Sequence, residues 1–380
     1  MKPNPSDAFN AAFSKINIAA LFQSSYAESR NVLLQKLERL QQQHIIRSEH
    51  HFWSLPEKFL ETVDADFGTD VIWLGNADAS QVLVLISGTH GVEGFCGSAI
   101  QSFVLQALQA SWLVMPPNIA LLLIHALNPW GMHWARRCDQ EGIDLNRNFI
   151  DFQRQPHIDA RYREILTCLV EADTEIRREK TSALARQWGQ REFEQIFSGG
   201  QYECSWAPFY GGQHSAFASG VIDEIIVKWQ LEGRHLTVID IHSGLGPWAY
   251  GELISDHAEG DNGNREAFAL FGKNVALTNL GLSYSVPKLG LLDYRWHLLM
   301  LNHGCFLTLE FGTLGTDSLF DVLLNEHLFW YKNSPISADC NSYKKHRRAM
   351  LEHFCPQDTL WQQAALFRSW QLVQQYIASA

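Results

Sequence analysis

Residues 83–100 read LVLISGTHGVEGFCGSAI, and this stretch passes from an apolar strand through a glycine-rich loop into a helical pattern. An apolar run without alternation suits a strand that is buried on both faces of a largely parallel sheet. Three further runs have the same character, namely IALLLI (119–124), LTVIDI (236–241) and CFLTLEF (305–311). Each is followed by a loop and, further on, by a helical pattern, so the sequence predicts an α/β protein.

The rest of the chain adds helices to this framework. Residues 25–45 have the apolar spacing of a helix packed against the main body. The polar segment 151–205 is rich in Arg, Glu and Gln and indicates two helices inserted between strands. No linker or low-complexity segment divides the chain. We therefore expect a single domain spanning residues 1–380, with a helical insertion at 151–205.

The composition argues against several classes of partner. The net charge is −11, and the Lys and Arg residues form no long run that could follow a phosphate backbone, so nucleic acid is not expected. No apolar run approaches the roughly 20 residues of a membrane span, and the N-terminus is too polar for a signal peptide. We expect a soluble, cytoplasmic protein with no membrane partner. Seven scattered cysteines without a CxxC pair indicate neither a disulfide framework nor a thiolate zinc site. The sequence carries no signal for an oligomeric state.

Polar side chains follow each apolar run, at the positions where open α/β sheets bind their ligands. His90 and Glu93 follow the first run on a tight loop, and an imidazole nitrogen and a carboxylate oxygen can converge there on one cation, as zinc prefers. Alone this pair is weak evidence, because a loop His before a Glu at a helix N-terminus is also favoured without a metal.

The third run ends in a second histidine. Asp240 precedes His242 by two residues and points to the same face of the strand, because side chains alternate along a strand. A carboxylate beside a histidine ligand commonly orients its ring. The alternative is a hydrogen-bonded polar pair at the strand end.

Arginines and a buried glutamate follow the other two runs. Arg136 and Arg137 stand about ten residues before Arg147, which lies in DLNRNF (144–149). Guanidinium groups bind carboxylates in a bidentate manner, so these arginines are candidates for holding an anionic substrate. The alternatives are a capped turn for DLNRNF and a solvated surface pair for Arg136 and Arg137. Glu310 ends the fourth run, where burial would raise its pKa toward the range of a general base, unless a salt bridge holds it.

Together, the four strand ends supply two histidines and a glutamate for a metal, a second glutamate for a base and arginines for an anionic substrate. The order HGVE, DLNRNF, DIHSG and TLEFGT resembles the zinc carboxypeptidase superfamily, which includes the aspartoacylase and succinylglutamate desuccinylase branch. The match looks closest to a bacterial branch marked by NPWGMHWARR (128–137) and covers roughly residues 80–315. The resemblance implies a three-layer α/β/α fold with a central mixed, largely parallel twisted sheet.

The resemblance also implies roles for individual residues. His90, Glu93 and His242 match three ligands of one zinc ion, with a fourth position for water. Glu310 matches the carboxylate that takes a proton from that water. The residues that match the oxyanion and substrate groups are Arg137, or alternatively Arg136, for the oxyanion, and Asn146 and Arg147 for a free carboxylate.

This chain departs from the family pattern in two places. Val92 stands where the metal loop often has a charged or polar residue before the Glu. The mobile tyrosine of the carboxypeptidases has two candidates, Tyr294 and Tyr284, and neither lies in a recognisable motif. Arg295 follows Tyr294 directly in the sequence. One interpretation is that it lines the specificity pocket and favours an acidic substrate side chain; the alternative is a surface or structural role.

The main hypothesis is a zinc-dependent hydrolase that cleaves an amide bond next to a free carboxylate, as a metallocarboxypeptidase-type peptidase does. Its substrate is then a small peptide, or alternatively an N-acyl amino acid cut by a deacylase. A catalytically silent metal-binding or interaction protein is the alternative of another class, and a two-metal aminopeptidase would need more bridging carboxylates.

Overall fold

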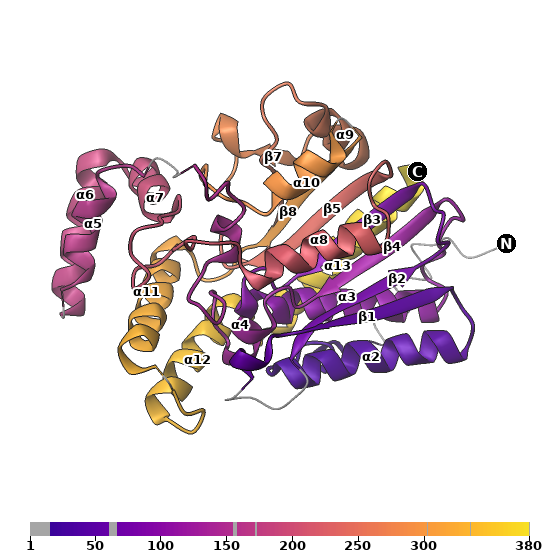
Figure 1. Cartoon of the computed structure of the whole chain (residues 1–380), viewed down its shortest axis with the longest axis horizontal. Coiled ribbons are helices and arrows are strands. Elements are labelled where there is room, and N and C mark those ends of the chain that lie inside the picture. Colours follow the sequence, from indigo (N-terminus) through magenta and orange to yellow (C-terminus); the bar gives the residue numbers. More distant parts are fainter. Residues whose placement is uncertain are drawn as a thin grey trace.

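The computed structural model describes residues 16–60, 67–154, 158–171, 173–301, 303–334 and 336–379 (Figure 1). These residues form one eight-stranded sheet with the order β1-β2-β4-β3-β5-β8-β6-β7. The strands are β1 Ser48–Ser54, β2 Gly68–Leu74, β3 Gln81–Ser87, β4 Ile119–His125, β5 His235–Ser243, β6 Gly251–Ser255, β7 Val275–Leu277 and β8 Gly304–Phe311. The four predicted strands are thus β3, β4, β5 and β8, and they lie side by side.

The middle of the sheet is parallel and its margins are mixed. β4, β3, β5 and β8 pair in parallel, whereas β2 joins β4 and β6 joins β8 in antiparallel fashion. Every residue of β4 is buried, as expected for a strand with apolar side chains on both faces. The predicted mixed, largely parallel sheet is confirmed.

Helices cover both faces of the sheet, which gives the predicted three layers (Figure 1). Alternate side chains of the strands pack on one face against α2 (Tyr26–Gln42), α3 (Gly94–Gln109) and α13 (Thr359–Ser379). The other alternate set packs against α8 (Phe217–Lys228) and α10 (Asp293–Met300). The remaining helices are α4 Pro129–Trp134, α9 Asn262–Phe271, α11 Thr316–Asn333, α12 Asn341–Phe354 and the 3-10 helices η1 Ile18–Ala20, η2 Glu57–Phe59, η3 Gly91–Glu93, η4 Leu145–Arg147 and η5 Thr278–Leu280.

In its described residues, the polar segment 151–205 contains three helices where two were expected. They are α5 (Tyr162–Leu169), α6 (Thr174–Trp188) and α7 (Gln190–Ser198). Asp173 caps the start of α6 with its side chain, and Gly189, at a φ of 93°, separates α6 from α7. In Figure 1 these helices project at one end of the molecule, beside α11.

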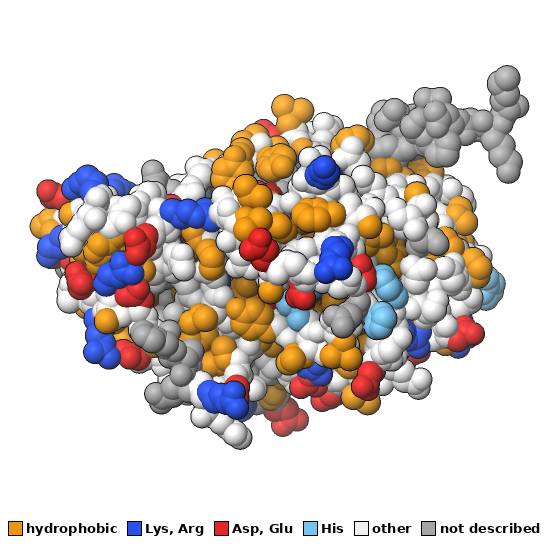
Figure 2. Space-filling view, turned by 90° about the horizontal axis from the view of Figure 1, so that it is seen from above, with side chains coloured by type: hydrophobic (Ala, Val, Ile, Leu, Met, Phe, Trp, Pro, Cys, Tyr) orange, Lys and Arg blue, Asp and Glu red, His pale blue; other side chains and the backbone are white. Residues whose placement is uncertain are grey.

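The insertion helices carry charges of both signs. Figure 2 shows Lys, Arg, Asp and Glu side chains intermixed at that end of the surface. Several of them pair, including Arg161 with Glu192 at 2.8 Å and Lys180 with Glu171 at 2.8 Å. The face of the insertion seen in Figure 2 therefore carries charges of both signs. Among the described residues, no helix combines the length and apolar character needed to cross a bilayer.

The fold brings three strand ends together at one edge of the sheet. β3, β5 and β8 are adjacent and parallel, so their carboxyl ends point the same way. In the register of β5 and β8, His242 lies opposite Glu310. Leu236 and Val238 of β5 belong to the core under α8. Asp240 and His242 follow at the same spacing, so they point to the same face of the strand near its end.

The loop after β3 is packed tightly against the chain that follows β4. The amides of Gly91 and Val92 donate to the carbonyl oxygens of Arg137 (3.3 Å) and Arg136 (2.8 Å). A Cβ on Gly91 would lie 2.1 Å from the carbonyl carbon of Gly131. Residue 91 must therefore be glycine for the loop to reach this position.

The Gly91→Ala substitution tests this close approach. We expect it to lower the free energy of unfolding by about 2 kcal/mol, because backbone must move to admit the methyl group. Gly220→Ala is the matched control, since a Cβ there meets nothing within 4 Å on α8. It should raise the free energy of unfolding by about 0.5 kcal/mol. Urea unfolding followed by circular dichroism measures both, and equal midpoints for Gly91→Ala and wild type would contradict the argument.

Candidate metal centre and active site

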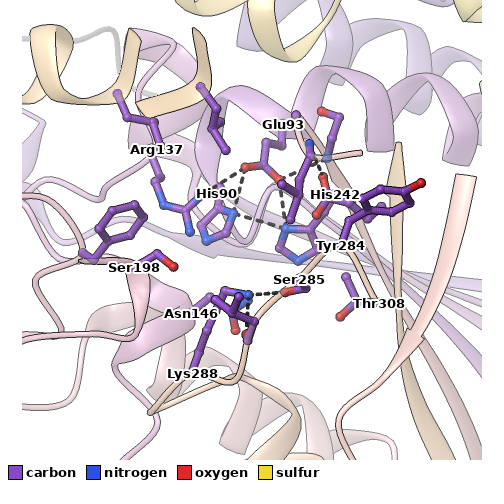
Figure 3. A pocket seen from close by; sticks show the side chains of 18 of the residues that line it. His90, Glu93, Arg137, Asn146, Ser198, His242, Tyr284, Ser285, Lys288 and Thr308 are labelled. Carbon is purple, nitrogen blue, oxygen red and sulfur yellow. Dashed lines mark hydrogen bonds and ion pairs between the residues drawn. The ribbon is translucent and has the colours of Figure 1, made fainter. Parts of the chain in front are cut away.

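Three buried side chains converge at the carboxyl edge of the sheet. His90 follows β3, Glu93 ends η3 at the start of α3, and His242 lies on β5. One possible ligand atom from each lies within 4.8 Å of the others. Figure 3 shows the two imidazoles and the carboxylate pointing toward one another.

Glu93 is shared by the two histidines. Its Oε1 lies 2.9 Å from Nδ1 of His90, and its Oε2 lies 2.8 Å from Nδ1 of His242. The two Nδ1 atoms are 3.2 Å apart. Both rings therefore turn the same nitrogen toward a common point beside the carboxylate.

A second carboxylate holds the far nitrogen of each ring. Asp240 lies 2.6 Å from Nε2 of His242, and Asp144 lies 3.2 Å from Nε2 of His90. A carboxylate in this place favours a proton on Nε2 and leaves the lone pair of Nδ1 free. Asp240 is itself held by the hydroxyl of Thr89, which donates to it at 2.9 Å.

The pKa shifts follow from these contacts. Burial would raise the pKa of Glu93, but the histidines His90 and His242 hold it well below its usual range. Burial would lower the pKa of His242, but Asp240 and Glu93 raise it well above its usual value. The cluster thus combines imidazoles and carboxylates that interact strongly, as the side chains of a metal-ligand set do.

The donor atoms fit zinc. Two imidazole nitrogens and one carboxylate, with both rings fixed by outer carboxylates, are a common ligand set of catalytic zinc. Within the described part of the chain, His90, Glu93 and His242 are the group of His, Cys, Asp and Glu residues that could hold a metal ion.

Glu310 lies next to this group, opposite His242 on the neighbouring strand. Its Oε1 accepts a hydrogen bond of 3.1 Å from the amide of Leu245. Burial, and then the charge of Glu93, raise the pKa of Glu310 to about 8. Its carboxyl group lines the same pocket as His90, Glu93 and His242, so it can exchange a proton there.

The two adjacent arginines have different surroundings. Arg137 lines the pocket and donates to Asp144 (2.8 Å) and to Glu93 (3.3 Å). Arg136 is not among the pocket residues; it is buried, forms an ion pair with Glu326 and lies 4.4 Å from the ring centre of Trp330. The structure brings Arg137, and not Arg136, to the cluster.

Asn146 and Arg147 also line the pocket. The Asn146 side-chain oxygen accepts a hydrogen bond of 2.8 Å from the amide of Leu292. Arg147 is fully buried, and burial lowers its pKa to about 10. Their predicted role in binding a carboxylate remains a prediction, and their position permits it.

The two tyrosine candidates differ in their position relative to the pocket. Tyr284 lines the pocket and is 53% exposed, which leaves its ring room to move. Tyr294 is absent from the lining, and its hydroxyl donates to the carbonyl oxygen of Lys288 at 3.0 Å. Arg295 pairs with Asp223 at 2.6 Å and does not line the pocket either.

Three pocket or support residues were missed from the sequence. Asp144 lies within DLNRNF; it caps η4, and it also holds His90. Lys288 and Asp256 line the pocket from segments that have no periodic pattern. Of these three residues, only Asp144 could have been suspected from the sequence as a support of a histidine ligand, by analogy with Asp240 beside His242.

Comparison with solved structures shows that the fold is similar to that of carboxypeptidase A. Carboxypeptidase A from Helicoverpa armigera is similar with a TM-score of 0.50 and 14% identity, over 99% of this chain and 80% of that chain. Bovine thrombin-activatable fibrinolysis inhibitor has a TM-score of 0.47 and 12% identity, over 93% and 99% of the two chains. A metallo-carboxypeptidase from Pseudomonas aeruginosa has a TM-score of 0.39 and 13% identity, over 88% and 68%.

The sequence comparison defines the family. The model described as "Protein of unknown function (DUF2817)" matches residues 22–368, and the chain belongs to that family. No curated protein matches the sequence. At 14% identity, the similarity to carboxypeptidase A shows the fold alone.

The Asp240→Asn substitution tests the support of the metal ligands. We expect purified wild type to hold about one zinc per chain. Asn at 240 should weaken zinc binding about 10- to 100-fold, because an amide no longer fixes the Nε2 proton of His242. Titration against a competing chelator, with metal analysis by mass spectrometry, measures the change. Asp223→Asn, at an exposed carboxylate, is the control, and equal zinc affinity in the two variants would contradict the assignment.

Proposed function

We propose that the protein is a zinc-dependent hydrolase that cleaves an amide bond next to a free carboxylate, as a metallocarboxypeptidase-type peptidase does. The observation that carries this proposal is the placement of Glu310 opposite His242, beside a buried two-histidine, one-carboxylate cluster. A metal site with a neighbouring carboxylate on one face of a pocket is an arrangement that hydrolyses amides. The fold shared with carboxypeptidase A is consistent with it.

When bound, zinc would polarise the substrate carbonyl and lower the pKa of water at His90, Glu93 and His242. In this proposal, Glu310 accepts a proton from the attacking water and then donates it to the leaving nitrogen. The raised pKa of Glu310, about 8, suits a group that must be both base and acid near neutral pH, although a nearby cation would lower it.

Two arginines have separate tasks in the proposed reaction. Arg137 is anchored through Nε to Asp144 at 2.8 Å, so its guanidinium faces the cluster in a fixed orientation. It is placed to stabilise negative charge that develops on the carbonyl oxygen. Arg147, with Asn146, binds the free carboxylate of the substrate and so selects the bond next to the chain end.

The helices over the pocket favour short substrates. Glu194 and Ser198 of α7, together with Thr316, Leu319, Phe320 and Leu323 of α11, line the side away from the sheet. Side chains of these two helices narrow the space that a long chain would occupy. This observation keeps an N-acyl amino acid deacylase as the second candidate, since a short acyl group and a short peptide present the same amide and carboxylate.

The Glu310→Gln variant tests the proposal. We expect it to retain zinc and to lose turnover by about 100- to 10,000-fold, because Gln neither accepts nor donates the proton. Zinc-loaded protein is incubated with a panel of dipeptides, tripeptides and N-acyl amino acids, each also as its C-terminal carboxamide. Mass spectrometry identifies the bond that is cut, and the carboxamides should react poorly.

Glu259→Gln, at an exposed position, is the matched control and should react like wild type. Equal rates for Glu310→Gln and wild type would refute the mechanism. If no panel member is hydrolysed while zinc is bound, and a cellular partner is retained specifically, the protein is instead a silent metal-binding protein.

A further inference from the structure

Two cations of the pocket have no carboxylate partner. Arg147 donates from Nε and Nη2 to the carbonyl oxygen of Ser198, at 3.0 and 2.7 Å, and from Nη1 to that of Asn146. The ammonium of Lys288 donates to the hydroxyl of Ser285 and, at 3.0 Å, to the carbonyl oxygen of Val286. Within the described ranges, neither cation forms an ion pair with Asp or Glu.

The other arginines at this edge of the sheet differ. Arg137 pairs with Asp144 and Glu93, and Arg136 pairs with Glu326. Removing a cation from water without a counterion costs free energy, even when backbone oxygens accept its hydrogen bonds. The end of the pocket formed by Arg147 and Lys288 therefore favours an anionic ligand.

The backbone that carries Lys288 is fixed at both ends. The Glu252 carboxylate accepts from the hydroxyl of Ser283 at 2.9 Å and from the amide of Tyr284 at 3.2 Å. On the far side, the amide of Leu289 donates to Gly199 at 2.8 Å, and the carbonyl oxygen of Gly290 accepts from Phe149 at 3.1 Å. This segment and the hydrogen bonds to Ser285 and Val286 hold the ammonium in the pocket, and Figure 3 shows the bond to Ser285.

The charges near Lys288 leave it open to an anion. Burial, and then the Arg147 guanidinium, lower the pKa of Lys288 to about 8, while Asp256 and Glu310 oppose the shift. Lys288 therefore remains mostly protonated at neutral pH. Burial raises the pKa of Asp256, which weakens that carboxyl group as a counterion. An anionic group of the substrate would be a better counterion for Lys288 than Asp256 is.

We propose that Lys288 determines specificity by binding a second anionic group of the substrate, beyond the carboxylate held by Arg147. The amino acid on the carboxyl side of the scissile bond is then a dicarboxylic one, such as aspartate or glutamate. This inference rests on the function proposed above. It assigns the preference for an acidic substrate to Lys288 instead of Arg295, which was the candidate from the sequence. Arg147 and Lys288 hold the two carboxylates in this proposal, and both residues line the same pocket as Asn146.

Ligand binding tests this inference without turnover. L-glutamate, L-glutamine, L-aspartate and L-asparagine are titrated into zinc-loaded protein by isothermal titration calorimetry. Wild type should bind each acid about 10- to 100-fold more tightly than its amide, since a charged hydrogen bond distinguishes them. Lys288→Met keeps an unbranched side chain, one heavy atom shorter, without the charge, so the ratio should fall to near one. Lys288→Arg should keep a preference for the acids.

Lys273→Met is the control at an exposed lysine and should preserve the wild-type ratio. With substrates, Lys288→Met should raise KM for acidic leaving groups by a larger factor than KM for neutral ones. Equal binding of acid and amide by wild type, a ratio that survives in Lys288→Met, or no binding of any of the four ligands would overturn the inference.

The experiments distinguish a failure of the proposed hydrolase function from a failure of the proposed role of Lys288. Hydrolysis that depends on Glu310 but shows no acidic preference would leave the proposed function standing and remove the role of Lys288. An acidic binding preference that disappears in Lys288→Met, without any hydrolysis, would leave the binding site and remove the proposed reaction.

Discussion

The site depends on one buried carboxylate that two imidazoles share. Glu93 contacts Nδ1 of both His90 and His242, while Asp144 and Asp240 hold the opposite nitrogens. Three buried carboxylates thus contact the two rings, and Arg137 pairs with two of these carboxylates, Glu93 and Asp144. Burial would lower the pKa of His242, but Asp240 and Glu93 raise it. A divalent cation held by His90, Glu93 and His242 would balance the same carboxylates.

The scaffold makes this arrangement possible by delivering its parts from separate strands. β3, β5 and β8 are parallel neighbours, so the loop with His90 and Glu93, the end of β5 and the end of β8 meet at one edge. The substrate side is built differently. Arg147 ends the short helix η4, and Lys288 lies on a segment without regular structure. Hydrogen bonds to α7 and to Glu252 hold these two parts of the chain. In the proposed function, the metal ligands and the base come from the ends of parallel strands and the loop after β3, whereas the substrate-binding groups come from the segments around them.

Much of the sheet could be predicted because buried parallel strands have continuous apolar runs. The placement of His90, Glu93, His242 and Glu310 in one pocket could be anticipated for the same reason, since parallel strands end at one edge. The choice between Arg136 and Arg137 could not, because it depends on the packing of Glu326 and Trp330 from α11. Lys288 was missed because contacts distant in sequence, to Gly199 and Phe149, decide where its segment lies. The number of helices in the insertion was wrong by one because the break at Gly189 is a single residue.

Anomalous diffraction from crystals of zinc-loaded protein, measured on both sides of the zinc absorption edge, tests the central claim most directly. The account predicts one strong zinc peak, about 2.0–2.2 Å from Nδ1 of His90, Nδ1 of His242 and an oxygen of Glu93. It also predicts that the Glu310 carboxylate lies near the peak without binding it. No peak at this position, or a zinc ion held by other residues, would contradict the account.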